Sequence, residues 1–161
     1  MTWHIPLVVA AAAFLAVVLW RVRPAFGPAR PSLRVALKDA RERIEAAKDD
    51  KSKAIALCDA ADVCALSLGR ASSAHGYYLR AMRCDPQSVD IIDRAAKGLK
   101  RRPRDLEHVL WRRLAQSEWK GDMRAPAIAA LKHLVELYDD RLRSPHRARA
   151  LEHAIVALSD T

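Results

Sequence analysis

The sequence predicts an all-α protein, with an N-terminal transmembrane helix followed by a short solenoid of antiparallel helix pairs that contains about seven helices. Three observations predict this fold class. Gly is scarce while Ala, Leu and Arg abound, which favours helix over strand. An uncharged apolar run opens the chain, and the remainder repeats apolar residues at spacings of three and four between helix-ending signals.

Residues 1–22 form the predicted membrane anchor. Residues 3–20 carry no charge, and as a helix they would span roughly 27 Å, close to a hydrocarbon core of about 30 Å. Trp3 and Trp20 flank the run at positions suited to the two membrane interfaces. A cleaved signal peptide would need a basic region before the run and small residues after it, where Trp20 and Arg21 stand instead. A buried helix of a soluble protein is disfavoured because nothing polar marks a second face.

The formal charge of +9 falls entirely after residue 20, and five of the cations follow the anchor directly: Arg21, Arg23, Arg30, Arg34 and Lys38. The positive-inside rule then places the C-terminal domain in the cytoplasm and the N-terminus outside. Cys58, Cys64 and Cys84 lack metal-type spacing and are expected to be free thiols, which agrees with a reducing compartment. We therefore expect a single-pass protein of the inner (cytoplasmic) membrane, and the Ala-, Arg- and Leu-rich usage suggests a bacterial source.

A Pro-rich basic linker, residues 23–31, separates the anchor from an all-helical domain, residues 32–161. Ser, Pro and Gly residues mark the expected helix ends within that domain. The expected helices are 32–50 with Ser32 as cap, 52–68, 72–84 starting at Ser72 or Ser73, 88–101, 103–119, 125–142 and 145–159. The first could pair with a second copy as a coiled coil, but it is short, and its apolar residues are expected to pack on the second helix.

Helix 72–84 carries the most specific pattern. Ala74, Tyr78 and Ala81 are followed by Pro86, an order of small, aromatic, small and helix-ending residues that resembles the second helix of a tetratricopeptide repeat (TPR). The helix before it matches the first helix of that family more loosely, at Leu57, Ala60, Ala61 and Cys64. In this reading the small positions let neighbouring helices touch, and Tyr78 fills the gap between them.

The resemblance weakens along the chain. The next first helix is in register at Ile92, Ala95, Ala96 and Leu99, but its partner has His108 and Arg112 where a small residue and an aromatic belong. The last pair fits only with a longer connection, at Leu131, Leu134, Val135 and Tyr138 and then Ala150, Ala154 and Ala157. An unrelated helical bundle therefore stays open as the alternative. If the resemblance holds, it implies a concave groove for a peptide or partner helix and no chemistry.

No motif predicts catalysis, a cofactor or a metal site. His108 and His133 fall on different helices, and His146 and His153 are seven apart without a carboxylate or thiol at ligand spacing. Phosphate-binding glycine loops and nucleophile signatures are absent from the sequence. We therefore expect a non-enzymatic protein.

Basic residues gather at the expected junction of helices 88–101 and 103–119: Lys97, Lys100, Arg101, Arg102 and Arg104. A second group is Arg141, Arg143, His146, Arg147 and Arg149. Cations at helix C-termini oppose the helix dipole, which explains part of this pattern. Nucleic-acid binding would require stacking aromatics or a recognition helix, and only Trp111 is near. Anionic lipid and an acidic protein partner are both compatible with the charge.

Together these features predict a membrane-anchored TPR-like adaptor that mediates protein–protein interaction at the cytoplasmic face of the membrane. The alternative is a basic helical accessory or regulatory protein that binds anionic lipid or nucleic acid. The two functions differ in their expected response to salt, since electrostatic binding weakens between low and moderate ionic strength.

Overall fold

The computed structural model describes Phe14 and residues 31–66, 71–116 and 118–160. The chain divides into two units, Met1–Arg30 and Pro31–Thr161, and the second contains all the helices discussed below. The predicted anchor, apart from Phe14, and nearly all of the predicted linker lie outside the described residues. Within the described ranges, no helix combines the length and the apolar character needed to cross a membrane.

The described residues form seven α-helices and one short 3-10 helix, with no strand among them, which confirms the all-α prediction. The α-helices are α2 (Pro31–Ala46), α3 (Asp50–Leu66), α4 (Ala71–Cys84), α5 (Val89–Gly98), α6 (Pro103–Leu114), α7 (Arg124–Asp140) and α8 (Pro145–Ser159). The 3-10 helix η2 (Gly121–Met123) precedes α7.

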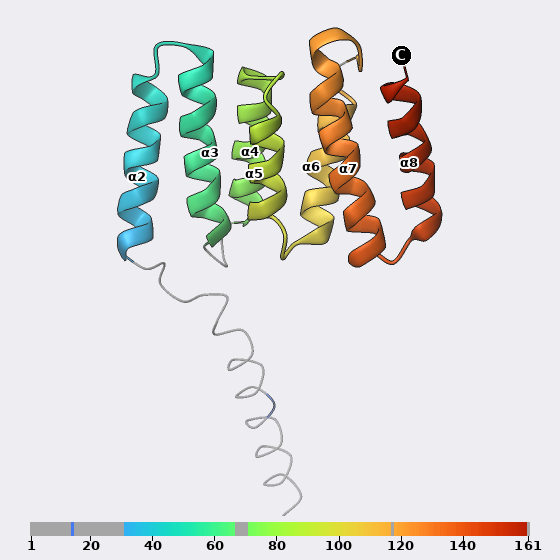
Figure 1. Ribbon diagram of the computed structural model, residues 1–161. Helices are drawn as coiled ribbons and strands as arrows, with labels where there is room; N and C mark the ends of the chain where they lie inside the picture. Colours follow the sequence, from blue (N-terminus) through green and yellow to red (C-terminus); the bar gives the residue numbers. More distant parts are fainter. Residues whose placement is uncertain (1–13, 15–30, 67–70, 117, 161) are drawn as a thin grey trace, which may run out of the picture. The chain divides into compact units, whose positions relative to one another are not determined.

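Successive helices run antiparallel and stack side by side (Figure 1). Helices α3, α5 and α7 pack against one another in one row, and α4 packs on α6 in a second row. Among the described elements, the backbone of α2 packs closely only on α3, and that of α8 only on α7. Single side chains reach one helix farther, from Arg41 of α2 to Tyr77 of α4 and from Arg147 of α8 to Glu107 of α6. Contact between near neighbours alone is typical of repeat architectures, and the arrangement is compatible with a helical repeat.

Small side chains form much of the core. Helix α3 buries seven residues: Ala54, Ala56, Leu57, Cys58, Ala60, Ala61 and Cys64. Because the distance between packed helices depends on the side chains at the contact, an Ala-rich helix can approach its neighbours closely. Larger residues fill the remaining space, above all Tyr78, Tyr138 and Met82, which are almost completely buried.

Several helix ends differ from the predicted ones. Helix α3 starts at Asp50 because Asp49 caps it: the backbone N–H of Ser52 donates to Asp49 Oδ1 at 2.6 Å. The hydrogen bonds that the Ser52 side chain and then its backbone donate to Asp49 lower the pKa of the Asp49 carboxyl. Helix α2 begins at Pro31, so Ser32 lies inside the first turn and is not its cap.

Helix α6 ends at Leu114, five residues before the predicted end at Trp119. The Trp119 indole N–H donates to the Leu114 carbonyl at 2.9 Å, so the side chain supplies a donor that a continuing helix would have supplied from its backbone. Helix α5 likewise stops at Gly98, short of the predicted Arg101.

Candidate partner-binding face

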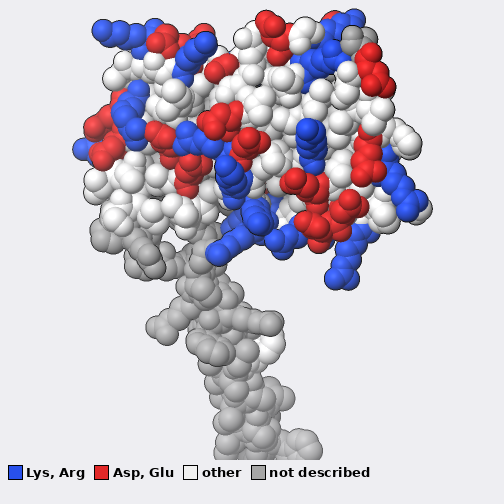
Figure 2. All heavy atoms as spheres, in the orientation of Figure 1, with Lys and Arg blue, Asp and Glu red and all other residues white. Residues whose placement is uncertain are grey.

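The row of α3, α5 and α7 presents one outward face of the domain. On α3, positions 55, 59, 62 and 66 are spaced four, three and four apart, so they lie on one side of the helix. Ile55 and Leu66 stand 60% and 75% exposed on that side. Acidic and basic side chains are intermixed across this view of the molecule (Figure 2).

A charged cluster joins three helices on this face. The Arg94 guanidinium of α5 donates to Asp59 Oδ1 at 2.8 Å and to Asp62 Oδ2 at 3.1 Å, both on α3. Arg43 of α2 donates to the other Asp59 oxygen at 2.7 Å. Burial opposes the charge on Arg94, but its two carboxylate partners outweigh burial and raise its pKa. These contacts fix α2, α3 and α5 relative to one another.

Tyr78 reaches the same cluster from the second row. Its hydroxyl donates to Asp62 Oδ1, so Asp62 accepts hydrogen bonds from both α4 and α5. Burial, and then the Asp62 carboxylate, raise the pKa of Tyr78. The phenol therefore stays neutral and acts as a fixed hydrogen-bond donor.

A histidine connects α5 to α7 farther along the row. The two ring nitrogens of His133 lie 2.7 Å from Asp93 Oδ1 and 3.3 Å from Glu136 Oε2. The Asp93 contact crosses between helices, whereas Glu136 lies one turn on in α7 itself. The ring is thus held between two carboxylates, and both of its nitrogens have partners.

Tyr138 makes a second cluster of the same kind between α6, α7 and α8. Its hydroxyl donates to Glu107 Oε1 at 2.6 Å and accepts the Trp111 indole N–H at 3.0 Å. Arg147 of α8 lies 3.5 Å from the same Glu107 oxygen and covers the Tyr138 ring at 5.5 Å. In both clusters a buried tyrosine donates to a carboxylate on the preceding helix, and an arginine on the following helix pairs with that carboxylate.

Five of the six predicted packing residues lie within the core. Leu57, Ala61, Ala74, Tyr78 and Ala81 are each 0% exposed. Pro86 follows the end of α4, its side chain is exposed, and its carbonyl accepts a hydrogen bond from Arg113. Arg113 is itself only 4% exposed, and burial lowers its pKa.

The predicted packing positions of the last helix were right in part. Ala154 is partly buried against the core, but Ala150 and Ala157 are exposed, and α8 buries Ala148 and Leu151.

The predicted basic patch lies at the junction of α5 and α6. Four of its five residues line a hollow of about 550 Å³, namely Lys97, Lys100, Arg101 and Arg102. Arg94, Asp62, Ala65 and Leu66 also line it. Arg102 forms an ion pair with Asp105 at 3.8 Å. The Trp111 indole N–H donates to the Tyr138 hydroxyl at 3.0 Å, and the side chain is 40% exposed.

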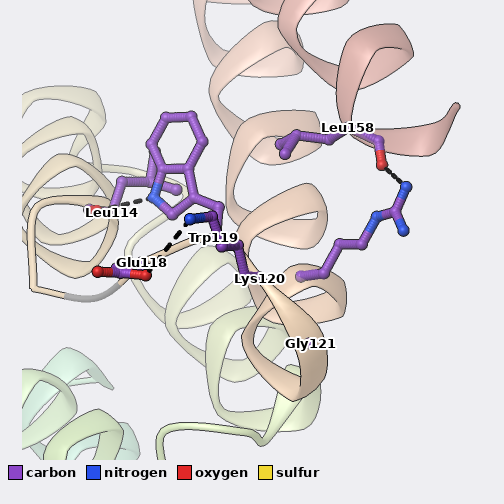
Figure 3. Close-up of a pocket in the computed structure, with 7 residues that line it drawn as sticks. Leu114, Glu118, Trp119, Lys120, Gly121 and Leu158 are labelled. Atoms are coloured by element: carbon purple, nitrogen blue, oxygen red, sulfur yellow. Dashed lines mark hydrogen bonds and ion pairs between the residues drawn. The ribbon is translucent and has the colours of Figure 1, made fainter. Parts of the chain in front are cut away.

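A second hollow, of about 710 Å³, lies between the end of α6, η2 and the end of α8 (Figure 3). Trp119 forms one wall, and Arg124 crosses to the Leu158 carbonyl at the other side. Glu118 and Lys120, which also line this hollow, form an exposed ion pair with a nitrogen-to-oxygen distance of 3.8 Å. Among the described residues, no group of three or more His, Cys, Asp or Glu side chains could hold a metal ion.

No protein-family model, curated protein or solved structure matches this chain.

Proposed function

We propose that this protein is a membrane-attached helical-repeat adaptor of the TPR type, whose α3–α5–α7 row binds a protein partner. One observation carries the proposal: α3, α5 and α7 form a single row, and successive antiparallel helices stack behind and beside it. Such a row offers an extended surface that no single helix pair could provide.

The TPR reading rests on the positions that the family uses for packing. Ala74, Tyr78 and Ala81 are fully buried on α4, and Leu57 and Ala61 are fully buried on the helix before it. Small residues at the helix crossings and one aromatic wedge are what the resemblance implies for such a pair. The face left outward then carries the exposed aliphatic Ile55 together with paired charges, a mixture suited to a protein surface.

The membrane attachment rests on the uncharged run of residues 3–20 and the arginines that follow it. In this proposal the helical domain lies on the cytoplasmic side of the inner membrane. Deleting residues 1–22 is expected to move the protein from the membrane fraction to the soluble fraction. A truncated chain that still sediments with membranes would remove the anchor from the account.

Affinity capture with matched variants tests the partner-binding face. Ile55→Asp with Glu136→Lys alters exposed positions of α3 and α7, whereas Val156→Asp with Glu152→Lys makes the same chemical changes on α8. We expect proteins captured by the detergent-solubilised wild-type chain to be lost from the first variant and kept by the second. Equal capture by both variants would show that the row is not the binding surface.

The alternative function, a basic accessory protein that binds anionic lipid or nucleic acid, is favoured by the cationic hollow beside α5. Its signature is salt sensitivity, because neutralising phosphates releases counterions. Two results would favour this function over the adaptor: loss of capture between low and moderate salt, and unchanged capture by the variant Ile55→Asp with Glu136→Lys.

A further inference from the structure

The two ends of the helical stack differ in charge. Because successive helices alternate in direction, α2, α4, α6 and α8 begin at one end, where α3, α5 and α7 finish (Figure 1). We name this the basic end and define it by residues 31–34, 63–66, 71–74, 97–105 and 139–147. The opposite end comprises residues 45–52, 82–90, 112–116, 118–124 and 157–160.

The basic end carries nine cations: Arg34, Lys97, Lys100, Arg101, Arg102, Arg104, Arg141, Arg143 and Arg147. It carries three acids: Asp105, Asp139 and Asp140. The opposite end carries seven cations: Lys48, Lys51, Arg83, Arg112, Arg113, Lys120 and Arg124. Its eight acids are Glu45, Asp49, Asp50, Asp85, Asp90, Glu118, Asp122 and Asp160. The excess of positive charge therefore lies at one end of the described stack.

The basic end also contains the hollow of about 550 Å³. Basic side chains gather at the lower edge of the helical domain in the view of Figure 2. Leu66 lies at the rim of this hollow, 75% exposed. Among the described residues that line it, Asp62 is the one acid, and Arg94 already pairs with that carboxylate. An exposed aliphatic side chain beside an excess of basic over acidic side chains is suited to the boundary between lipid headgroups and acyl chains.

The chain enters the domain at this same end, because α2 begins there at Pro31. Eight residues, 23–30, separate Pro31 from the predicted anchor, and fully extended they reach at most roughly 28 Å. With the anchor proposed above, a tether of this length limits how far the basic end can move from the membrane. Lys and Arg that come within a Debye length of about 8 Å of the surface are attracted by anionic headgroups.

We propose that the basic end lies against anionic phospholipid, with a phosphate-bearing headgroup seated in the hollow between α3 and α5. This inference rests on the membrane attachment within the proposed function. The α3–α5–α7 row then stands upright from the membrane, and its outward face stays open to a partner while the loops at the basic end contact lipid.

Hydrogen exchange of the full chain in lipid nanodiscs tests this inference. The discs contain phosphatidylcholine alone, or phosphatidylcholine with phosphatidylglycerol. We expect the loops at 98–104 and 140–146 to exchange about tenfold more slowly in the anionic discs. The loops at 46–50 and 84–89, at the opposite end, are expected to exchange equally in both.

A charge-reversal variant and a matched control complete the test. Lys100→Glu with Arg101→Glu and Arg102→Glu should abolish the slowing in anionic discs. Lys48→Glu with Lys51→Glu and Lys120→Glu, the same change of charge at the opposite end, should leave it intact. Slowing that survives the first variant, or that is equal in neutral discs, overturns the inference.

The same samples distinguish this inference from the anchor itself. A chain that stays with the discs but exchanges equally in both lipids refutes the headgroup contact alone. A chain that separates from the discs during purification refutes the membrane attachment, and the headgroup inference with it.

Discussion

At the scale of single residues, Tyr78 and Gly98 fit each other closely. Gly98 is the last residue of α5, and a Cβ there would lie 3.1 Å from Tyr78 Cζ and closer still to the hydroxyl. Glycine is normally about 1 kcal/mol less favourable than alanine within a helix. Its place here is explained by the approach of the phenol, which carries the hydrogen bond to Asp62.

This fit predicts a coupling between the two positions. Gly98→Ala should lower the free energy of unfolding by about 1–3 kcal/mol in the wild-type chain, because the added methyl group overlaps the phenol. In a Tyr78→Phe background most of that cost should disappear, since the hydroxyl is gone. A double-mutant cycle of urea unfolding measures the coupling. Equal costs in both backgrounds would contradict the placement of Tyr78.

Tyr78→Ala measures how much the whole buried ring contributes to the free energy of unfolding, for comparison with that cycle. Removing the whole ring should cost about 3–5 kcal/mol, because a buried side chain then leaves a cavity between three helices. A change near zero would show that no gap between helices depends on this residue, and the main support for repeat packing would be lost.

His75 predicts a dependence of stability on pH. Its ring lies 4.8 Å from that of His108 on α6, and burial first, then the His108 charge, lower its pKa. Asp105 raises that pKa and Arg112 lowers it further, but the net shift is downward. The unfolded chain, with an ordinary pKa of about 6.5, therefore binds a proton that the folded chain resists.

Because its folded-state pKa is lowered, His75 contributes its full stability above the unfolded pKa, and this contribution is lost as the pH falls below about 6.5. Urea unfolding at pH 7.5 and 5.5 should show that acidification lowers the free energy of unfolding less for His75→Gln than for the wild type. An identical loss in both proteins would contradict a lowered pKa at His75.

At the scale of helices, Arg94 is the charge that joins α5 to α3. Replacing it with Met leaves Asp59 and Asp62 side by side with fewer donors, and should cost about 1–3 kcal/mol of unfolding free energy. Arg94→Lys should recover only part of this, because an ammonium lacks the planar fork that meets two carboxylates.

Arg80→Met is the matched control for Arg94→Met. Arg80 is exposed on α4, so the same substitution there should change the unfolding free energy by less than about 0.5 kcal/mol. If both substitutions had the same small effect, the cluster around Arg94 would not hold the helices together.

The helices themselves could be predicted from local sequence, because the signals that start and stop them lie within a few residues. Pro103 and Pro145 open α6 and α8 as expected. The end of α6 was missed because it depends on the Trp119 side chain, which helical periodicity counts as one more apolar residue.

The polar clusters between helices could not be predicted in the same way. Asp62 meets Arg94 across 32 positions, and Tyr138 meets Glu107 across 31. Each of these residues, taken alone, is an ordinary charged or aromatic residue on a helix surface, and no periodic pattern links them. The shared geometry of the two tyrosine clusters becomes visible only once the helices are stacked.

At the scale of the whole domain, the helices are arranged as an open row, as in a helical repeat, rather than as a closed bundle. Helices α2 and α8 stand at its two ends, and within the described residues the backbone of each packs closely on a single neighbour. The path between them passes through α3, α5 and α7. A closed bundle of the same helices would bring its first and last members together around a shared core.

The distance between spin labels at Val35→Cys on α2 and Glu152→Cys on α8 tests this claim most directly. Cys84 would be replaced by Ser, while buried Cys58 and Cys64 can remain, since burial raises the pKa of Cys58 to about 12. The path from α2 through α3, α5 and α7 to α8 contains four spacings of about 9 Å between helix axes, so we expect the two labelled helices to lie roughly 35 Å apart. A distance below roughly 20 Å, as expected for adjacent helices carrying long labels, would contradict the open row.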